Sequence, residues 1–118
     1  MATAWSSSHA LRRGADVIHV LAEVRLAPGA RELFLAEFRL LEPKVRAEAG
    51  CIEYVGTVDT KTTIAAQAPL RDDVVIVIEK WETEAALSAH LDAPHMVAYR
   101  KRVKGLVSST LIHVLSSA

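Results

Sequence analysis

Alternation of apolar and polar positions marks the first patterned segment, residues 16–27, with the sequence DVIHVLAEVRLA. Successive side chains of a strand point to opposite faces, so this alternation predicts a β-strand. One of its faces carries the apolar residues Ile18, Val20, Ala22, Val24 and Leu26. The turn sequence APG follows at residues 27–29 and is expected to end the strand.

Residues 30–49 change to the period of an amphipathic α-helix. Helical spacing relates Phe34, Phe38, Leu41 and Val45, with charged residues between them. Leu33 and Leu40 are expected to widen this apolar stripe on one side. Pro43 is expected to kink or divide the helix, because proline lacks an N–H donor, and Gly50 is expected to end it.

Two more strands are expected in the middle of the chain, at residues 51–59 and 73–82. The second of these is apolar through most of its length and is therefore expected to be central in the sheet. The connection between them is too long for a simple hairpin turn, and a short extra strand is expected near Thr62–Gln67.

The last third of the chain predicts two short helices and a final strand. Thr83 is expected to cap the first helix. Residues 92–94 should end that helix and begin the next, because proline is tolerated at a first helical position. Gly105 should close the second helix, and residues 106–117 are expected to form the last strand.

This order of elements, β-α-β-β-α-β, predicts an α+β fold of the ferredoxin-like, split βαβ type. The helices then cover one face of an antiparallel sheet, and the other face, which carries Leu21, needs a cover. A second copy of the same sheet would supply it, so we expect a homodimer. Residues 16–118 are assigned to this domain and residues 1–15 to a flexible N-terminal extension.

Composition narrows the classes of function. The chain has 118 residues, which favours one domain, and 14 basic residues balance 14 acidic ones, so neither nucleic acid nor a membrane surface is expected as a partner. The single cysteine, Cys51, is expected to be a small buried thiol and fits a reducing cytoplasm. No secretory signal or membrane-spanning run is expected.

Motifs for metals and tightly bound cofactors are not expected. His90 and His95 would point roughly 140° apart on one helix, and the helical i, i+4 pair of a zinc site is missing. The sequence has no nucleophile elbow, no dinucleotide fingerprint and no phosphate-binding loop of the P-loop type. We therefore expect no metal and no nucleotide cofactor.

Residues 79–105, EKWETEAALSAHLDAPHMVAYRKRVKG, combine Trp, His and Tyr at the end of a strand and along the two short helices. One interpretation is that these side chains fill the core, the usual place for aromatic residues at such spacing. The other is that they form a wall of a mostly apolar pocket with a few polar groups, which is the usual composition of a small-molecule site. The residues alone leave both open.

Four segments, AEVRLAPG, EAGCIEY, VIEKWETEAALSAHLDAPHMVAY and VKG, resemble in order and spacing the antibiotic biosynthesis monooxygenase family, and most closely the small bacterial quinol monooxygenases. The resemblance runs from Val17 to Leu115. It implies a ferredoxin-like monomer paired into a dimeric α+β barrel. It also implies oxidation of a small aromatic quinol or anthrone by O₂, and, because several members need no metal, flavin or haem, no cofactor.

The resemblance also suggests roles for individual residues. His90 corresponds to a pocket-facing position and is the candidate catalytic base, because histidine takes up protons near neutral pH. Tyr54 and Trp81 are candidates for positioning and stacking on the aromatic ring, and His95 and Tyr99 complete the candidate substrate-binding set. For Glu79, on the same strand face as Trp81, two roles stay open. It is either a buried hydrogen-bonding anchor for a helix or a catalyst.

Two other functions remain as alternatives. The dimeric barrel could bind or sense an aromatic metabolite without catalysis. Haem-degrading relatives use an Asn, a Trp and a His at three places where this chain has Ala22, His90 and Arg100. All three depart from the haem pattern, which disfavours haem oxygenation.

Overall fold

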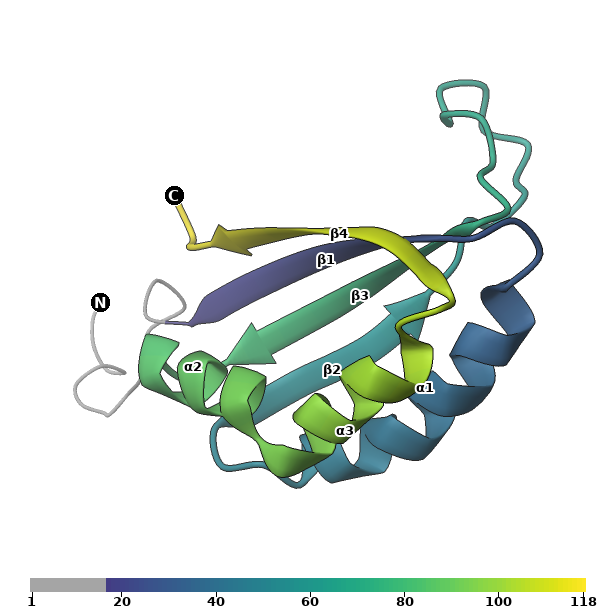
Figure 1. Cartoon of the computed structure of the whole chain (residues 1–118). Coiled ribbons are helices and arrows are strands. Elements are labelled where there is room, and N and C mark those ends of the chain that lie inside the picture. Colours follow the sequence, from purple (N-terminus) through teal and green to yellow (C-terminus); the bar gives the residue numbers. More distant parts are fainter. Residues whose placement is uncertain (1–16) are drawn as a thin grey trace.

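A computed structural model describes residues 17–118 and shows four strands and three helices among them (Figure 1). In chain order they are β1 (Ile18–Leu26), α1 (Arg31–Arg46), β2 (Cys51–Thr57), β3 (Val74–Trp81), α2 (Glu84–Asp92), α3 (Pro94–Val103) and β4 (Val107–Leu115). The predicted extension, residues 1–15, lies outside the described residues.

The strands form one antiparallel sheet in the order β2-β3-β1-β4, with the helices on one of its faces (Figure 1). This confirms the predicted ferredoxin-like α+β fold. The central position expected for β3 is also confirmed, because β3 pairs with both β1 and β2. The register places Tyr54 of β2 opposite Glu79 of β3, so both side chains stand on the helix-covered face.

The core lies between the sheet and α1. The alternating apolar residues of β1 from Val20 to Leu26 are buried there. The predicted stripe of α1 is confirmed, because Phe34, Phe38, Leu41 and Val45 are all buried. The expected widening of this stripe is wrong. Leu33 and Leu40 are 65% and 68% exposed, because the sheet contacts only a narrow line along the helix.

Pro43 does not divide α1, which continues to Arg46. The residue lies on the exposed side of the helix. Water can therefore hydrogen-bond to the carbonyl that loses its partner N–H at this point, which reduces the cost of the proline.

Residues 58–73 project from one end of the sheet (Figure 1). The short strand expected near Thr62–Gln67 is wrong, because no strand forms in this segment. Hydrogen bonds made by side chains within the segment stabilise it instead. Arg71 donates from Nε and Nη2 to the two carboxylate oxygens of Asp59, both at 2.9 Å, and Gln67 donates to the Thr60 carbonyl at 2.6 Å.

The boundary between α2 and α3 is as predicted. Thr83 caps α2, with its hydroxyl accepting from the Ala86 N–H at 3.0 Å. Ala93 has an extended backbone, φ −61° and ψ 141°, and Pro94 begins α3. This break turns the chain between His90 and His95. None of the three helices described in residues 17–118 is both long and apolar enough to cross a membrane.

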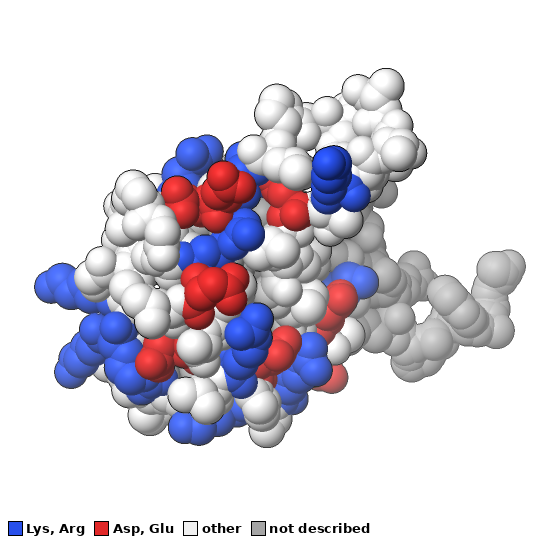
Figure 2. All heavy atoms as spheres, turned by 90° about the vertical axis from the view of Figure 1, so that its right-hand side faces the viewer, with Lys and Arg blue, Asp and Glu red and all other residues white. Residues whose placement is uncertain are grey.

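One surface shows how charge is distributed (Figure 2). On that face Lys and Arg side chains are interspersed with Asp and Glu and form no continuous basic patch. Pairs such as Arg71–Asp59 and Arg102–Glu37 bring opposite charges into contact. This arrangement agrees with the balanced composition.

The packing of α1 on β2 generates a stability prediction. A Cβ at Gly56 would lie 2.8 Å from Cε2 of Phe38, whereas a Cβ at Gly105 would meet nothing within 4 Å. We expect Gly56→Ala to lower the free energy of unfolding by about 1–3 kcal/mol, because the buried ring must shift. Urea denaturation measures the change. Gly105→Ala is the matched control, and equal stability of the two variants would contradict the predicted clash.

Candidate active site

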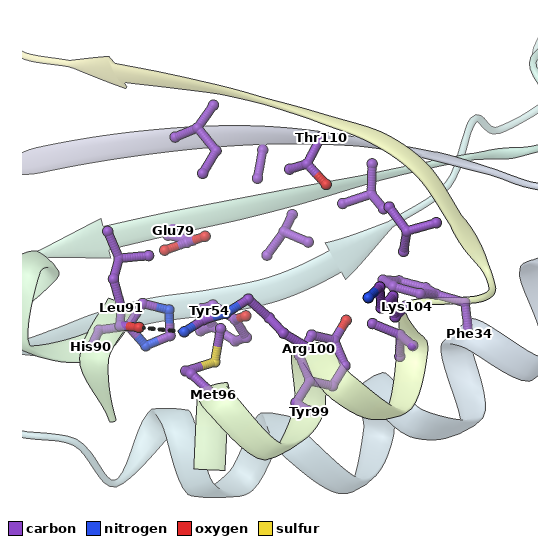
Figure 3. Close-up of a pocket in the computed structure, with 16 residues that line it drawn as sticks. Phe34, Tyr54, Glu79, His90, Leu91, Met96, Tyr99, Arg100, Lys104 and Thr110 are labelled. Atoms are coloured by element: carbon purple, nitrogen blue, oxygen red, sulfur yellow. Dashed lines mark hydrogen bonds between the residues drawn. The ribbon is translucent and has the colours of Figure 1, made fainter. Parts of the chain in front are cut away.

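A cavity of about 330 Å³ opens between the helix-covered face of the sheet and the helices (Figure 3). Its wall is largely apolar and includes Ala22, Val24, Phe34, Val77 and Met96. The polar side chains of the lining are Tyr54, Glu79, His90, Tyr99, Arg100, Lys104 and Thr110. An apolar chamber with a few polar groups suits a small aromatic molecule.

His90, on α2, is the most deeply buried of the ionisable groups that line the cavity, at 1% exposed. Its Nδ1 lies 3.0 and 3.2 Å from the two carboxylate oxygens of Glu48. A carboxylate accepts hydrogen bonds, so this contact assigns the ring proton to Nδ1. Nε2 is then left with its lone pair.

The Nε2 atom of His90 has no hydrogen-bond partner among residues 17–118. In the same residues, every side-chain nitrogen or oxygen that is sealed from solvent has a hydrogen-bond partner. Nε2 is therefore not sealed in the core and borders the cavity. A ligand hydroxyl in the cavity would meet a hydrogen-bond acceptor at this atom.

Glu48 was not among the residues singled out from the sequence. It lies in the turn between α1 and β2, just before Gly50, whose φ of +84° suits glycine. Gly50 also allows close approach of α2, because a Cβ there would lie 2.6 Å from Cβ of Ala86. This close contact places the Glu48 turn beside α2. No local sequence signal would have identified that long-range contact.

Glu48 also bonds His95, whose Nε2 lies 2.5 Å from Oε2 of the carboxylate. On one continuous helix His90 and His95 would point apart, but the break at Ala93 lets both reach the same carboxylate. His95 does not line the cavity. Its role in the structure is to be the second hydrogen-bond partner of Glu48, the carboxylate that also contacts His90.

The pKa of His90 is lowered from its ordinary value. Burial is the main cause, because it disfavours the charged imidazolium, and the hydrogen bond and charge of Glu48 oppose it. His90 is therefore largely neutral at neutral pH. A neutral imidazole with a free Nε2 is the form that can accept a proton.

Trp81 packs against His90, with ring centroids 4.6 Å apart, and is fully buried. It does not line the cavity. Its Nε1–H donates to Oε1 of Glu79 at 2.9 Å. The Trp81 indole thus contacts both His90 and Glu79. Figure 3 shows these two residues at the same end of the cavity.

Glu79 is buried, at 6% exposed, and lines the cavity. Its pKa is raised to about 7, mainly because burial disfavours the carboxylate. The hydrogen bond from Trp81 opposes this shift and the nearby charge of Glu48 adds to it. Its hydrogen-bond partner among residues 17–118 is the indole of Trp81 on the same strand, so the structure does not show Glu79 as an anchor for a helix.

Tyr54 and Tyr99 both line the cavity. The Tyr54 ring stacks on Phe38, with ring centroids 5.5 Å apart, and packs edge-on against His90, with ring centroids 5.4 Å apart. Burial raises the pKa of both phenols above the ordinary value, so they stay neutral. Each can give or accept a hydrogen bond without becoming charged.

Within residues 17–118, no group of three or more His, Cys, Asp and Glu side chains is arranged to hold a metal ion. Cys51 is half-buried, and burial raises the pKa of its thiol. A thiol with a raised pKa is a weak nucleophile at neutral pH.

Comparison with known proteins gives consistent results. The family model described as antibiotic biosynthesis monooxygenase matches residues 17–102. The protein named probable quinol monooxygenase YgiN of Escherichia coli K12 is 39% identical over 101 residues, which span 84% of this chain and 96% of YgiN.

Solved structures share the fold. PA3566 from Pseudomonas aeruginosa is 25% identical, with a TM-score of 0.73 over 91% of this chain and 99% of its own. SO0527 from Shewanella oneidensis is 26% identical, with a TM-score of 0.71 over 87% and 92%. The cavity, the family match and these relatives agree that the chain belongs to the antibiotic biosynthesis monooxygenase family.

Proposed function

We propose that this protein is a cofactor-independent monooxygenase that oxidises a small aromatic quinol or anthrone with O₂. The observation that carries the proposal is the neutral His90, whose free Nε2 borders an apolar cavity while Glu48 holds Nδ1. The similarity to YgiN, a probable quinol monooxygenase, supports the same class of substrate.

The first chemical step is removal of a proton from the substrate. A phenolic hydroxyl has a pKa of roughly 10, so it is almost wholly protonated at neutral pH. Hydrogen bonding to Nε2 of His90 lets the proton move as the anion forms. The anion is electron-rich and passes electrons to O₂ directly, which is why the substrate itself can take the place of a redox cofactor.

The cavity wall supplies the remaining requirements. Apolar side chains such as Phe34 and Met96 contact the flat ring and exclude water, which strengthens the hydrogen bonds made inside. Tyr54 and Tyr99 provide neutral hydrogen-bonding groups along the wall. Trp81 would act from behind, by fixing the plane of the His90 ring and the Glu79 carboxyl.

Removal of His90 is the primary test. We expect His90→Ala to reduce kcat for O₂ uptake with menadiol by about 10²–10⁴-fold, the usual contribution of a positioned base. An oxygen electrode measures uptake above the autoxidation blank. Lys44→Ala is the control, because Lys44 is exposed on α1, away from the proposed dimer face, and does not line the cavity.

The outcomes separate the proposal from its alternative. Uptake by wild-type protein that is lost in His90→Ala and kept in Lys44→Ala supports catalysis by His90. Menadiol binding with no uptake by the wild type would instead identify a module that binds an aromatic metabolite.

The Glu48 contact predicts a shift in pH dependence. The charge of Glu48 raises the pKa of His90, so Glu48→Gln should lower that pKa further. Because only neutral His90 accepts a proton, the acid limb of kcat/KM should move to lower pH. At neutral pH kcat should fall by about tenfold or more, since the base is weaker and less firmly oriented.

Steady-state O₂ uptake as a function of pH measures this limb. The matched control is Glu42→Gln, which removes a partner of Arg46 on the surface of α1 and should leave the profile unchanged. An acid limb that stays in place in Glu48→Gln would show that Glu48 does not act on His90.

The proposal includes a homodimer. The face of the sheet opposite the helices carries the apolar side chains of Leu21, Ile76, Ile78, Leu111 and Leu115. Of these, Leu21 is 40% exposed and Leu111 is 55% exposed. Burial of such a face is favourable at about 25 cal/mol per Å² of apolar area, and a second sheet of the same kind can provide it.

Sedimentation equilibrium tests this pairing. We expect wild-type protein to have twice the monomer mass and Leu21→Lys to shift towards the monomer, because the Lys charge would be buried between two sheets. Leu33→Lys is the control, since Leu33 is exposed on α1, away from the proposed interface. A wild-type monomer at micromolar concentration would contradict the proposed dimer.

A further inference from the structure

The buried carboxyl group of Glu79 is not used in the proton transfer described above. It lines the cavity from β3, at 6% exposed, at the same end as His90 (Figure 3). Burying a carboxyl group is costly unless its oxygens have partners. Only Oε1 of Glu79 has one among residues 17–118, the Nε1–H of Trp81 at 2.9 Å.

The other oxygen, Oε2, therefore borders the cavity, by the same argument as for Nε2 of His90. Among residues 17–118, every side-chain oxygen or nitrogen that is sealed from solvent has a hydrogen-bond partner. Oε2 of Glu79 has none within these residues, so it is not sealed. The cavity thus presents two proton acceptors that come from different elements. Both rest on the indole of Trp81, which bonds one and packs against the other.

We propose that Glu79 is a second catalytic proton carrier and that the preferred substrate is a hydroquinone, with one hydroxyl at His90 and the other at Glu79. This inference rests on the proposed function and deepens it. An anthrone presents a single acidic site and would need His90 alone. A hydroquinone presents two hydroxyl groups on one ring and would use both acceptors.

The proton and electron balance fits two carriers. A hydroquinone that becomes a quinone loses two electrons and two protons. O₂ accepts both electrons and, with both protons, becomes hydrogen peroxide, so with a hydroquinone the protein acts as an oxidase. An anthrone would instead take up one oxygen atom as its CH₂ group becomes a carbonyl, and the second oxygen atom would leave as water. Nε2 of His90 and Oε2 of Glu79 each take one proton from a hydroxyl and return it to the reduced oxygen, so both residues end the cycle as they began.

The surroundings of Glu79 suit a group that both takes and gives a proton. The groups that face it are the indole of Trp81, Tyr54 opposite it on β2, and His90 on α2, with Glu48 and Arg100 further out. None of these places a cation against the carboxyl, and burial holds its pKa at about 7. Both protonation states are therefore populated at neutral pH.

Glu79→Gln is the informative variant. Its amide oxygen can still accept from Trp81, so the packing is preserved, but the side chain can no longer carry a proton. We expect kcat with menadiol, a hydroquinone, to fall by about tenfold to a hundredfold. With anthrone we expect a change of less than about threefold, because a single general base suffices for one acidic site.

The pH profile gives a readout that a purely structural role would not move. With menadiol, kcat/KM of the wild type should rise through pH 7 as Glu79 ionises, and this limb should vanish in Glu79→Gln. Glu32→Gln is the matched control, because Glu32 is exposed in the first turn of α1 and does not line the cavity. It should change neither the rates nor the profile.

Several results would overturn the inference. These are an equal loss with both substrates, full activity of Glu79→Gln on menadiol, or a wild type that oxidises anthrone but not menadiol. The proposed function has a different point of failure. It fails if the wild type consumes no O₂ with either substrate, whatever the variant does.

Discussion

The carboxylate of Glu48 shared by His90 and His95 is the interaction on which the rest of the site depends. It crosses from the turn after α1 to two helices that follow the third strand. By accepting from Nδ1 it determines which nitrogen of His90 faces the cavity. Without that choice of tautomer, the buried imidazole could present a donor instead of an acceptor to a ligand.

Two backbone features make this contact possible. Gly50 allows the turn after α1 to approach α2 at a distance that any side chain would prevent, since a Cβ there would overlap Ala86. The break at Ala93 and Pro94 then redirects the chain so that His95 returns to the same carboxylate. The site is thus held by ordinary elements of the fold, and its acid–base groups are fixed before a ligand enters.

The aromatic side chains join the core to the cavity. Phe38 stacks on Tyr54, Tyr54 meets His90, and His90 packs on Trp81. The two interpretations of this part of the sequence, core filling and pocket wall, therefore both describe the structure. Trp81 is core and supports the site from behind, whereas Tyr54 and His90 belong to the core and to the cavity wall together.

Much of the fold could be predicted because its signals are local. Alternation in β1, the helical spacing of Phe34 to Val45 and the cap at Thr83 each depend on neighbouring residues. The wrong predictions concern side chains whose exposure depends on what packs against them, such as Leu33, or segments held by side-chain bonds, such as residues 58–73. Glu48 escaped notice because its partners lie 42 and 47 positions away.

Anaerobic mixing of the protein with menadiol tests the central claim most directly, because it separates proton removal from the reaction with oxygen. The account predicts that the wild-type complex keeps menadiol reduced until O₂ is admitted and then oxidises it at a pH-dependent rate with a solvent deuterium isotope effect, both missing in an equally loaded His90→Ala complex. Equal rates of oxidation in the two complexes would contradict it.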